Sequence, residues 1–179
     1  MTKQIYQIQI ALQNSKPKIW RRVIVNSDIS LEDFHKIIQT TMGWTNSHLH
    51  HFVVGRTYYA PEEFELDDTK DTRRVKLNSI LQHEKEKIKY EYDFGDSWLH
   101  DIILEKILPF EKTIEIPKCI GGKQNCPPED CGGIWGYTEL LEIISNPKHK
   151  EYKEQMEWLG GEFEPEHFDI DEINKLLKE

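Results

Sequence analysis

The alternation of apolar and polar residues in two parts of the chain is the feature that most constrains its fold. Between positions 88 and 104 the chain alternates twice, and the pair Gly95-Asp96 lies between the two runs. A period of two sends successive side chains to opposite faces of a strand, and a short turn with glycine joins two such strands into a hairpin. We therefore predict an antiparallel hairpin whose buried face carries Ile88, Tyr90, Tyr92, Phe94, Trp98, His100, Ile102 and Leu104.

A second hairpin is predicted near the start of the chain. Residues 5–13 alternate, with Tyr6, Ile8, Ile10 and Leu12 on one face, and residues 19–25 follow after a turn at Pro17. Proline fixes its own backbone angle and is common in such turns. Two hairpins of this kind favour an antiparallel sheet with one face buried and the other polar.

The first long helix is predicted over residues 31–42. Ser30 precedes it as an N-cap, Asp33 follows three residues later as in a capping box, and Gly43 ends it. Its apolar face consists of Leu31, Phe34, Ile37, Ile38 and Met42, which recur at helical spacing.

The remaining elements are assigned from the same kinds of signal. We expect a short strand at 49–54, a helical turn at 77–81, and helices over 137–144, from the N-cap Asn146 and Pro147 to Gly160, and after the N-cap Asp169. Residues 59–74 and 109–134 are predicted to be loops, the second one rich in Pro, Gly and Cys. This order predicts an α+β fold, a mainly antiparallel sheet with helices packed on it in a single-domain sandwich spanning residues 1–179.

Composition narrows the class of protein. The 179 residues carry a net charge of −9 and 11% aromatic residues, so the chain is neither a general polyanion binder nor typical of disorder. No apolar stretch is long enough to cross a bilayer, and the start of the chain has no apolar signal-peptide core. We expect a cytoplasmic protein with no membrane partner, in which three cysteines are thiols or metal ligands rather than disulfides.

Charge is distributed unevenly. Residues 1–30 contain five cations and one carboxylate, whereas residues 151–179 contain three lysines and ten carboxylates. Such asymmetry can mark a nucleic-acid interface, but five dispersed cations are few for neutralising phosphates. We favour the interpretation that the basic start packs against the acidic end, so nucleic acid is a disfavoured partner.

The cysteines are the first candidate for chemistry. Cys119, Cys126 and Cys131 are spaced C-x6-C-x4-C within CIGGKQNCPPEDCGG. Three thiolates and one histidine would satisfy tetrahedral zinc, although this spacing differs from the C-x2-C of common zinc sites. Buried thiols in a tight loop are the alternative, and a redox role is less favoured. Zinc is the one cofactor that these residues suggest.

Histidines and carboxylates are the second candidate. His48 lies with two further histidines in NSHLHHF, and His100 lies in the second hairpin near Asp96. Two histidines and a carboxylate could bind a transition metal or transfer protons, whereas single histidines of this kind usually do neither. Glu129 and Asp130 are adjacent carboxylates that could divide acid and base roles, or could cap the glycine turn that follows.

The chain shows a resemblance to a known family. Five segments carry it: PKIWRR, GWTNSHLHHF, YEYDFGDSWLH, PKCIGGKQNCPPEDCGGIWGY and GGEFEPEHFDIDEIN, which are spread from position 17 to position 174. Together they resemble the plasmid ORF-three-like family, named for a root-inducing plasmid protein and sometimes labelled as a resolvase-like passenger of insertion elements. The resemblance implies an α+β sandwich and association with mobile elements, but no activity. His51 departs from the family pattern, in which an acidic residue is common there, and this weakens His51 as a ligand.

Two classes of function remain open, with a third less favoured. The favoured hypothesis is a binding module, in which a polar His/Asp cleft recognises a protein or small ligand and the cysteine loop supports it. The alternative is a metal-dependent hydrolase using His48, Asp96, His100 and Glu129, in which the metal activates water and a free carboxylate acts as base. Both hypotheses predict that the turn at Asp96 and the PPEDCGG loop converge on one cleft. A nucleic-acid-associated protein is the weaker third possibility.

Overall fold

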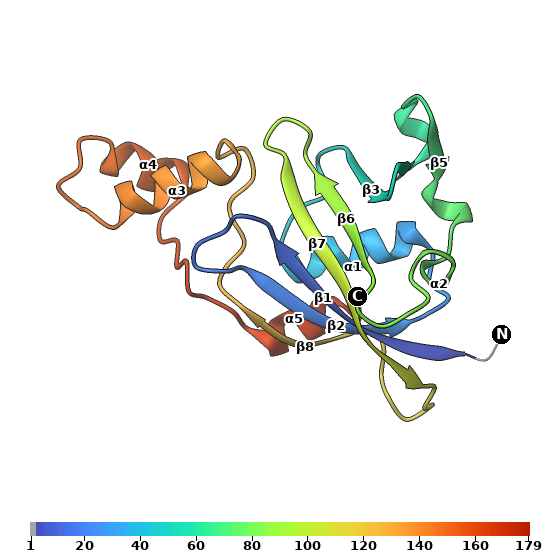
Figure 1. Ribbon diagram of the computed structural model, residues 1–179. Helices are drawn as coiled ribbons and strands as arrows, with labels where there is room; N and C mark the ends of the chain where they lie inside the picture. The colour runs from blue at the N-terminus through green and yellow to red at the C-terminus, as the bar shows by residue number, and fades with distance from the viewer. Residues whose placement is uncertain (1–2) are drawn as a thin grey trace.

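The protein is built on one eight-stranded sheet. The computed structural model describes residues 3–179, and within them the strand order is β5-β4-β3-β6-β7-β1-β2-β8 (Figure 1). Neighbouring strands are antiparallel, except that β4 and β5 are parallel. Helices accompany this sheet, so the predicted α+β class with a mainly antiparallel sheet is confirmed. The strands are β1 Gln4–Leu12, β2 Trp20–Asn26, β3 His50–Val54, β4 Thr57–Ala60, β5 Thr69–Asp71, β6 Lys87–Tyr92, β7 Trp98–Pro109 and β8 Lys118–Lys123.

Both predicted hairpins form, and β7 joins them. β1 pairs with β2, and β6 pairs with β7. Ile102 on β7 lies opposite Ile88 on one side and Ile10 on the other. Because these strands alternate in the same sense, their apolar side chains share one face, which is the buried face of the sheet.

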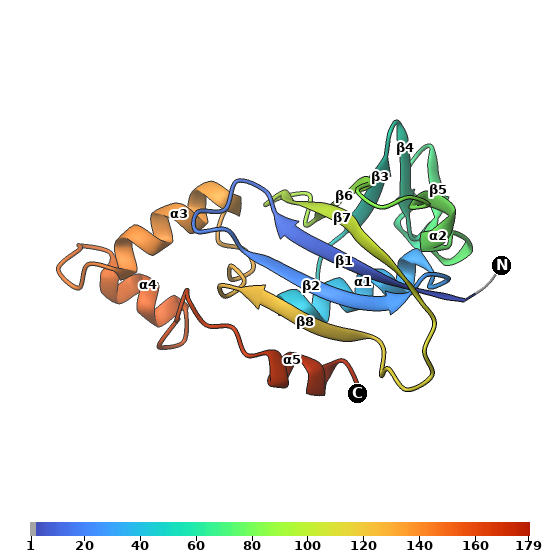
Figure 2. The same ribbon diagram turned by 60° about the horizontal axis from the view of Figure 1, so that its bottom comes forward.

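Helix α1 (Leu31–Met42) covers that face (Figures 1 and 2). It begins as predicted, because the Ser30 hydroxyl oxygen accepts a hydrogen bond from the backbone N–H of Asp33 at 3.0 Å. It ends at Gly43, whose φ of 102° lies in the left-handed region that glycine adopts readily. Phe34 and Ile38 are fully buried and join the core that the strands provide.

The predicted hairpin turn differs in detail. β6 ends at Tyr92, and Asp93 takes a φ of 60°, so the connection runs over residues 93–97 rather than through a two-residue turn at Gly95-Asp96. As a result Asp93 is only 7% exposed, whereas Phe94, predicted to be buried, is 37% exposed. The left-handed residue reverses the alternation at this point.

Both predicted loops contain strands. Residues 59–74 include part of β4, all of β5, and two 3-10 turns, Glu62–Phe64 and Thr72–Arg74. Residues 109–134 include β8, which pairs with β2. In both segments polar residues or glycines interrupt the alternation of apolar and polar residues, so the sequence does not indicate a strand. These strands form because their backbone groups pair with neighbouring strands toward the two edges of the sheet.

The later helices are α3 (Gly133–Ile144), α4 (Tyr152–Trp158) and α5 (Ile170–Leu176), and α2 (Leu77–Ile80) is the predicted helical turn. α4 does not begin at Asn146 and Pro147, because the Asn146 side chain accepts from Lys148 N–H and makes a separate turn. α3 and α4 form a hairpin that extends away from the sheet, whereas α5 lies along β8 (Figures 1 and 2). None of the helices within residues 3–179 has the length and apolar character needed to cross a membrane.

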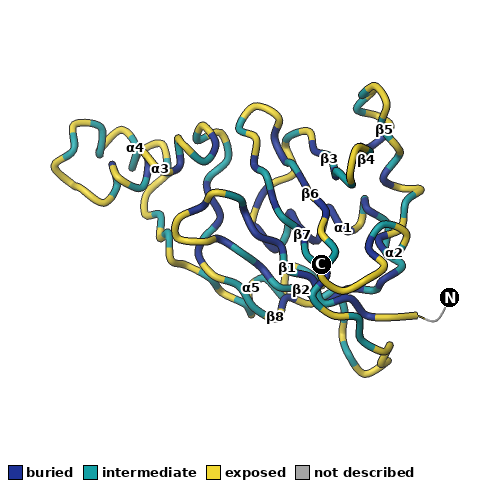
Figure 3. The backbone as a smooth tube through the Cα atoms, in the orientation of Figure 1, coloured by how far each residue is buried: buried dark blue, intermediate teal, exposed yellow. Residues whose placement is uncertain are grey.

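Burial follows this arrangement. In Figure 3 the buried residues concentrate in the central strands and in α1, and exposed residues dominate the outer parts of the α3–α4 hairpin. The end of the sheet nearest this hairpin brings together the segment after α1, the turn after β6, and the loop between β8 and α3. The predicted candidate residues lie mainly there.

Candidate functional site

Hydrogen bonds from the backbone hold the Asp93 side chain in place. Its Oδ1 accepts hydrogen bonds from the backbone N–H groups of Gly95 and Asp96, at 2.9 and 3.4 Å. Its own N–H donates to the carbonyl oxygen of Leu49, and its carbonyl accepts from Ser97 N–H. Aspartate tolerates the left-handed backbone because its short side chain can bond locally in this way. The second carboxylate oxygen, Oδ2, is left to face His48.

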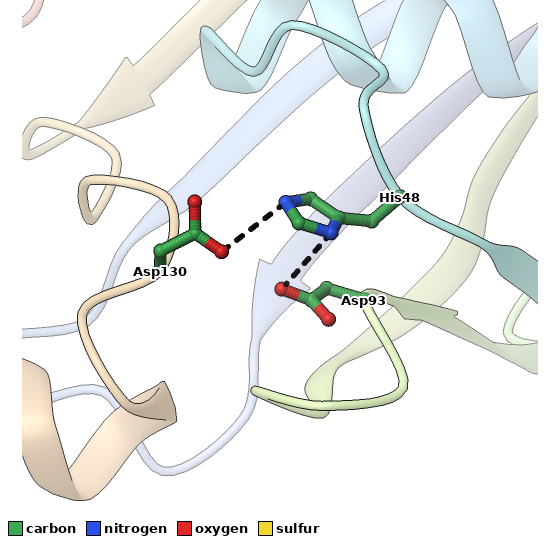
Figure 4. A group of neighbouring side chains, drawn as sticks. All are labelled: His48, Asp93 and Asp130. Atoms are coloured by element: carbon green, nitrogen blue, oxygen red, sulfur yellow. Dashed lines mark ion pairs between the residues drawn. The ribbon is translucent and has the colours of Figure 1, made fainter.

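His48 lies between two carboxylates (Figure 4). Its Nδ1 is 3.7 Å from Asp93 Oδ2, and its Nε2 is 3.5 Å from Asp130 Oδ1. One ligand atom from each of these three residues lies within 4.8 Å of the others, a spacing that a metal ion could bridge. Side-chain exposure rises from 9% at Asp93 to 26% at His48 and 73% at Asp130, so the group opens to solvent on the Asp130 side.

Asp96 ties the turn after β6 to the start of α3. Its Oδ2 accepts a hydrogen bond from Gly132 N–H at 3.1 Å. Gly133 approaches so closely that a Cβ there would lie 2.3 Å from the Asp96 carbonyl oxygen. The turn at Asp96 and the PPEDCGG loop, which the sequence predicts to converge, therefore meet, and the Asp96 carboxylate is the brace between them.

Glu129 is a second brace. Its carboxylate accepts hydrogen bonds from Tyr92 Oη at 2.6 Å, from Thr45 Oγ1 at 2.6 Å and from Thr45 N–H at 3.2 Å. Burial raises the pKa of Glu129, but these donors outweigh it and hold that pKa below its usual value. Burial, and then the bond to the Glu129 carboxylate, raises the pKa of Tyr92.

His100 lies in the core, apart from the group formed by His48, Asp93 and Asp130. It is completely buried, its ring meets Trp44 edge-on at 5.2 Å between centroids, and Tyr90 lies at 5.5 Å. Burial lowers the pKa of His100 to about 4, so the ring is neutral at neutral pH. The alternation of β7 that predicts a buried face also places His100 on that face, which removes it from the solvent-exposed group at His48.

The cysteines do not come together as a ligand set. Among residues 3–179, His48, Asp93 and Asp130 form a three-ligand group, and the three thiols do not. Cys119 is buried on β8 opposite Val23, Cys126 is buried in the loop, and Cys131 is partly buried just before α3; all three are free. Burial raises the pKa of each thiol, that of Cys131 to about 12. Pairing of β8 with β2 fixes Cys119 in the sheet, which the loop prediction did not foresee.

Asp93 is the residue that sequence reasoning missed. It occupies a polar position of an alternating run, and this pattern predicts a solvent-facing side chain. The signal that could have found it is the order Asp-Phe-Gly-Asp directly after a strand, since aspartate followed two residues later by glycine is typical of a side-chain-bonded turn.

Comparisons with known proteins cover nearly the whole chain. A family model described as plasmid pRiA4b ORF-3-like protein matches residues 4–172. The uncharacterized protein y4hQ of Sinorhizobium fredii is 37% identical over 180 residues, covering 99% of this chain and 92% of that protein. The crystal structure of a protein of unknown function, MM3350 from Methanosarcina mazei Go1, is similar with a TM-score of 0.86 and 35% identity, over 96% of this chain and 98% of that one.

Proposed function

The chain belongs to the plasmid pRiA4b ORF-3-like family, and we propose that it is a binding module that holds a divalent transition-metal ion at His48, Asp93 and Asp130. The observation that carries this proposal is the convergence of one imidazole and two carboxylates from three separate segments. Imidazole and carboxylate ligands together suit zinc, manganese and iron. Three protein ligands would leave further positions open for a bound partner or ligand.

The graded burial of the three side chains supports this proposal. Asp93 is oriented by backbone N–H groups and is nearly inaccessible, so it is preorganised before any ion arrives. A carboxylate fixed in this way loses little conformational entropy on binding. Asp130 is open to solvent and can complete the site from the outside.

A hydrolase is less well supported than a binding module. The hydrolase hypothesis requires a free carboxylate and a second histidine. Three of the four residues that it uses are already hydrogen-bonded or buried. Asp96 accepts from Gly132, Glu129 accepts from Thr45 and Tyr92, and His100 is buried. A general base must reach the proton that it abstracts, and these side chains are directed elsewhere.

Nucleic-acid binding is also less well supported. Of the cations near the start of the chain, Arg21 is 2% exposed and donates to the carbonyl oxygens of Thr41, Trp20 and Lys123. Arg22 makes a two-pronged ion pair with Glu105 at 2.6 and 2.8 Å. Neither guanidinium is available for phosphate. Arg22 thus pairs with Glu105 on β7, while the Arg21 guanidinium lies 5.0 Å from the ring centroid of Phe168 in the acidic C-terminal segment.

Titration calorimetry with zinc and manganese chloride tests the metal proposal on protein purified without a metal-affinity tag. We expect binding of one ion per chain, with affinity reduced about tenfold or more in His48→Ala and in Asp130→Asn, because each loses one ligand. His83→Ala changes an exposed histidine outside the proposed ligand group, serves as the matched control and should bind as the wild type does.

A further variant separates this site from the cysteines. Cys131→Ser should bind the ion with unchanged affinity, whereas zinc held by the cysteine loop would be weakened. The proposal is overturned if neither ion binds, or if His48→Ala binds both as tightly as the wild type does.

A further inference from the structure

Helix α3 has apolar side chains on several faces, and the neighbouring elements cover only some of them. Tyr137, Leu140 and Ile143 are buried, while Trp135 on the same helix is 84% exposed, far more than any other large hydrophobic side chain described in the structure. A helix that is apolar all round is normally buried. α3 instead lies in a hairpin that extends from the sheet (Figures 1 and 2).

A groove runs between α3 and α4. Its apolar lining residues are Leu140, Ile143 and Trp158; Leu140 and Ile143 are buried, whereas Trp158 is 49% exposed. The carboxylates among its lining residues are Asp130, Glu139, Glu151 and Glu154, and no lysine or arginine lines it. Glu151 is paired with Lys150 at 3.1 Å, whereas the salt bridges of residues 3–179 leave Glu139 and Glu154 without a cation.

Trp135 extends the same surface. It precedes Glu139 by four residues, and side chains at that spacing are neighbours on a helix face. The half-exposed Trp158 and carboxylates without a cation therefore line one groove, and the exposed Trp135 lies beside it. Tryptophan is enriched among the residues that contribute most to binding at interfaces, and apolar patches with a polar rim mark interaction sites.

We infer that the α3–α4 groove is the docking site for a basic amphipathic segment of a partner protein. The apolar side chains of such a segment would pack on the exposed surfaces of Trp158 and Trp135, and its lysines or arginines would face Glu139 and Glu154. A cation could also lie over the ring of Trp135. The charge of the groove selects this partner, because an acidic segment would be repelled by the same rim.

This inference does not depend on the metal proposal. Asp130 lies at one end of the groove and also faces His48, so the variants below leave Asp130 unchanged. Loss of docking and loss of metal binding can then be observed separately.

Calorimetry with two synthetic peptides tests the inference. One is an amphipathic helix of leucine and lysine, and the other has glutamate in place of every lysine. We expect the lysine peptide to bind, more weakly as salt increases, and the glutamate peptide not to bind. Affinity for the lysine peptide should fall about tenfold or more in Glu139→Lys/Glu154→Lys and several-fold in Trp135→Ala.

The control variant is Asp67→Lys/Glu111→Lys, which changes the net charge equally at exposed positions outside the groove. It should keep most of the affinity, because general attraction to an acidic protein is not the proposed mechanism. Circular dichroism checks that each variant is folded, and Trp135→Ala removes an exposed side chain whose loss leaves the core intact. Equal weakening in both double variants, binding of the glutamate peptide, or self-association that is abolished by Trp135→Ala would each overturn the inference.

Discussion

At the scale of single residues, Asp93 shows how one backbone conformation decides which side chains are available. A left-handed residue at the end of β6 turns a side chain assigned to solvent into a buried acceptor, and turns Phe94 outward. The same conformation directs Oδ2 of Asp93 at His48. Strand alternation predicts neither outcome, because alternation holds only while the backbone remains extended.

Replacing Asp93 tests this role. Asp93→Ala should lower the free energy of unfolding by about 1–3 kcal/mol, since it leaves two backbone N–H groups without an acceptor and places alanine in the left-handed region. Asp93→Asn keeps the accepting oxygen and tolerates that conformation, so it should cost much less. Urea denaturation measures both, and equal losses for the two variants would contradict the assigned role.

At the scale of elements, the site depends on how closely α3 approaches the turn after β6. Gly132 N–H donates to Asp96, and Gly133 leaves no space for a side chain against the Asp96 backbone. This contact between two short segments positions the loop that carries Asp130. The Pro, Gly and Cys content of that loop predicts a constrained loop, but it does not identify the partner that constrains it.

Gly133→Ala tests that approach. Its Cβ would lie 2.3 Å from a backbone oxygen, and its φ of 66° is unfavourable for alanine, so we expect a loss of stability larger than the roughly 1–2 kcal/mol of left-handed strain alone. Gly160→Ala is the matched control, because Gly160 has a φ of 73° but nothing within 4 Å of the added Cβ. Thermal unfolding compares the two, and similar shifts in Tm would show that the close approach contributes nothing.

At the scale of the whole molecule, three buried histidines from different elements couple stability to pH. His35 on α1 and His50 on β3 stack at 3.4 Å between ring centroids, and His100 lies on β7. Burial lowers the pKa of His35 to about 4, of His50 to about 3 and of His100 to about 4, from an ordinary 6.5. The folded protein therefore keeps these rings neutral where the unfolded chain would protonate them.

The sign of the pH dependence follows directly. Between about pH 6.5 and pH 4 the unfolded chain binds more protons at these histidines, so stability is full above 6.5 and is lost as the pH falls. Chemical denaturation from about pH 7 to about pH 5 should show the free energy of unfolding decreasing, before most carboxylates titrate. His50→Phe should make this decrease smaller, while the exposed His83→Phe should not. A stability that stays constant over that range would contradict the assignment.

What the sequence could predict depended on local periodicity. The two hairpins, helix α1 with its Ser30 cap and Gly43 end, and the α+β class follow from patterns that a short segment carries by itself. The edge strands β5 and β8 do not, because polar residues and glycines form strands there only when a neighbouring strand offers its backbone groups. The predicted start of α4 at Asn146 and Pro147 was wrong for a related reason, because an asparagine side chain can cap a turn as well as a helix.

The sequence by itself determined which residues alternate, where the first helix begins and ends, and which side chains carry possible ligands. Only the tertiary structure decided that His48 lies between Asp93 and Asp130, that Asp96 and Glu129 are braces, and that His100 is buried. Distances between residues that lie 36 to 82 positions apart in the chain depend on sheet register and loop closure, which no short stretch of sequence encodes.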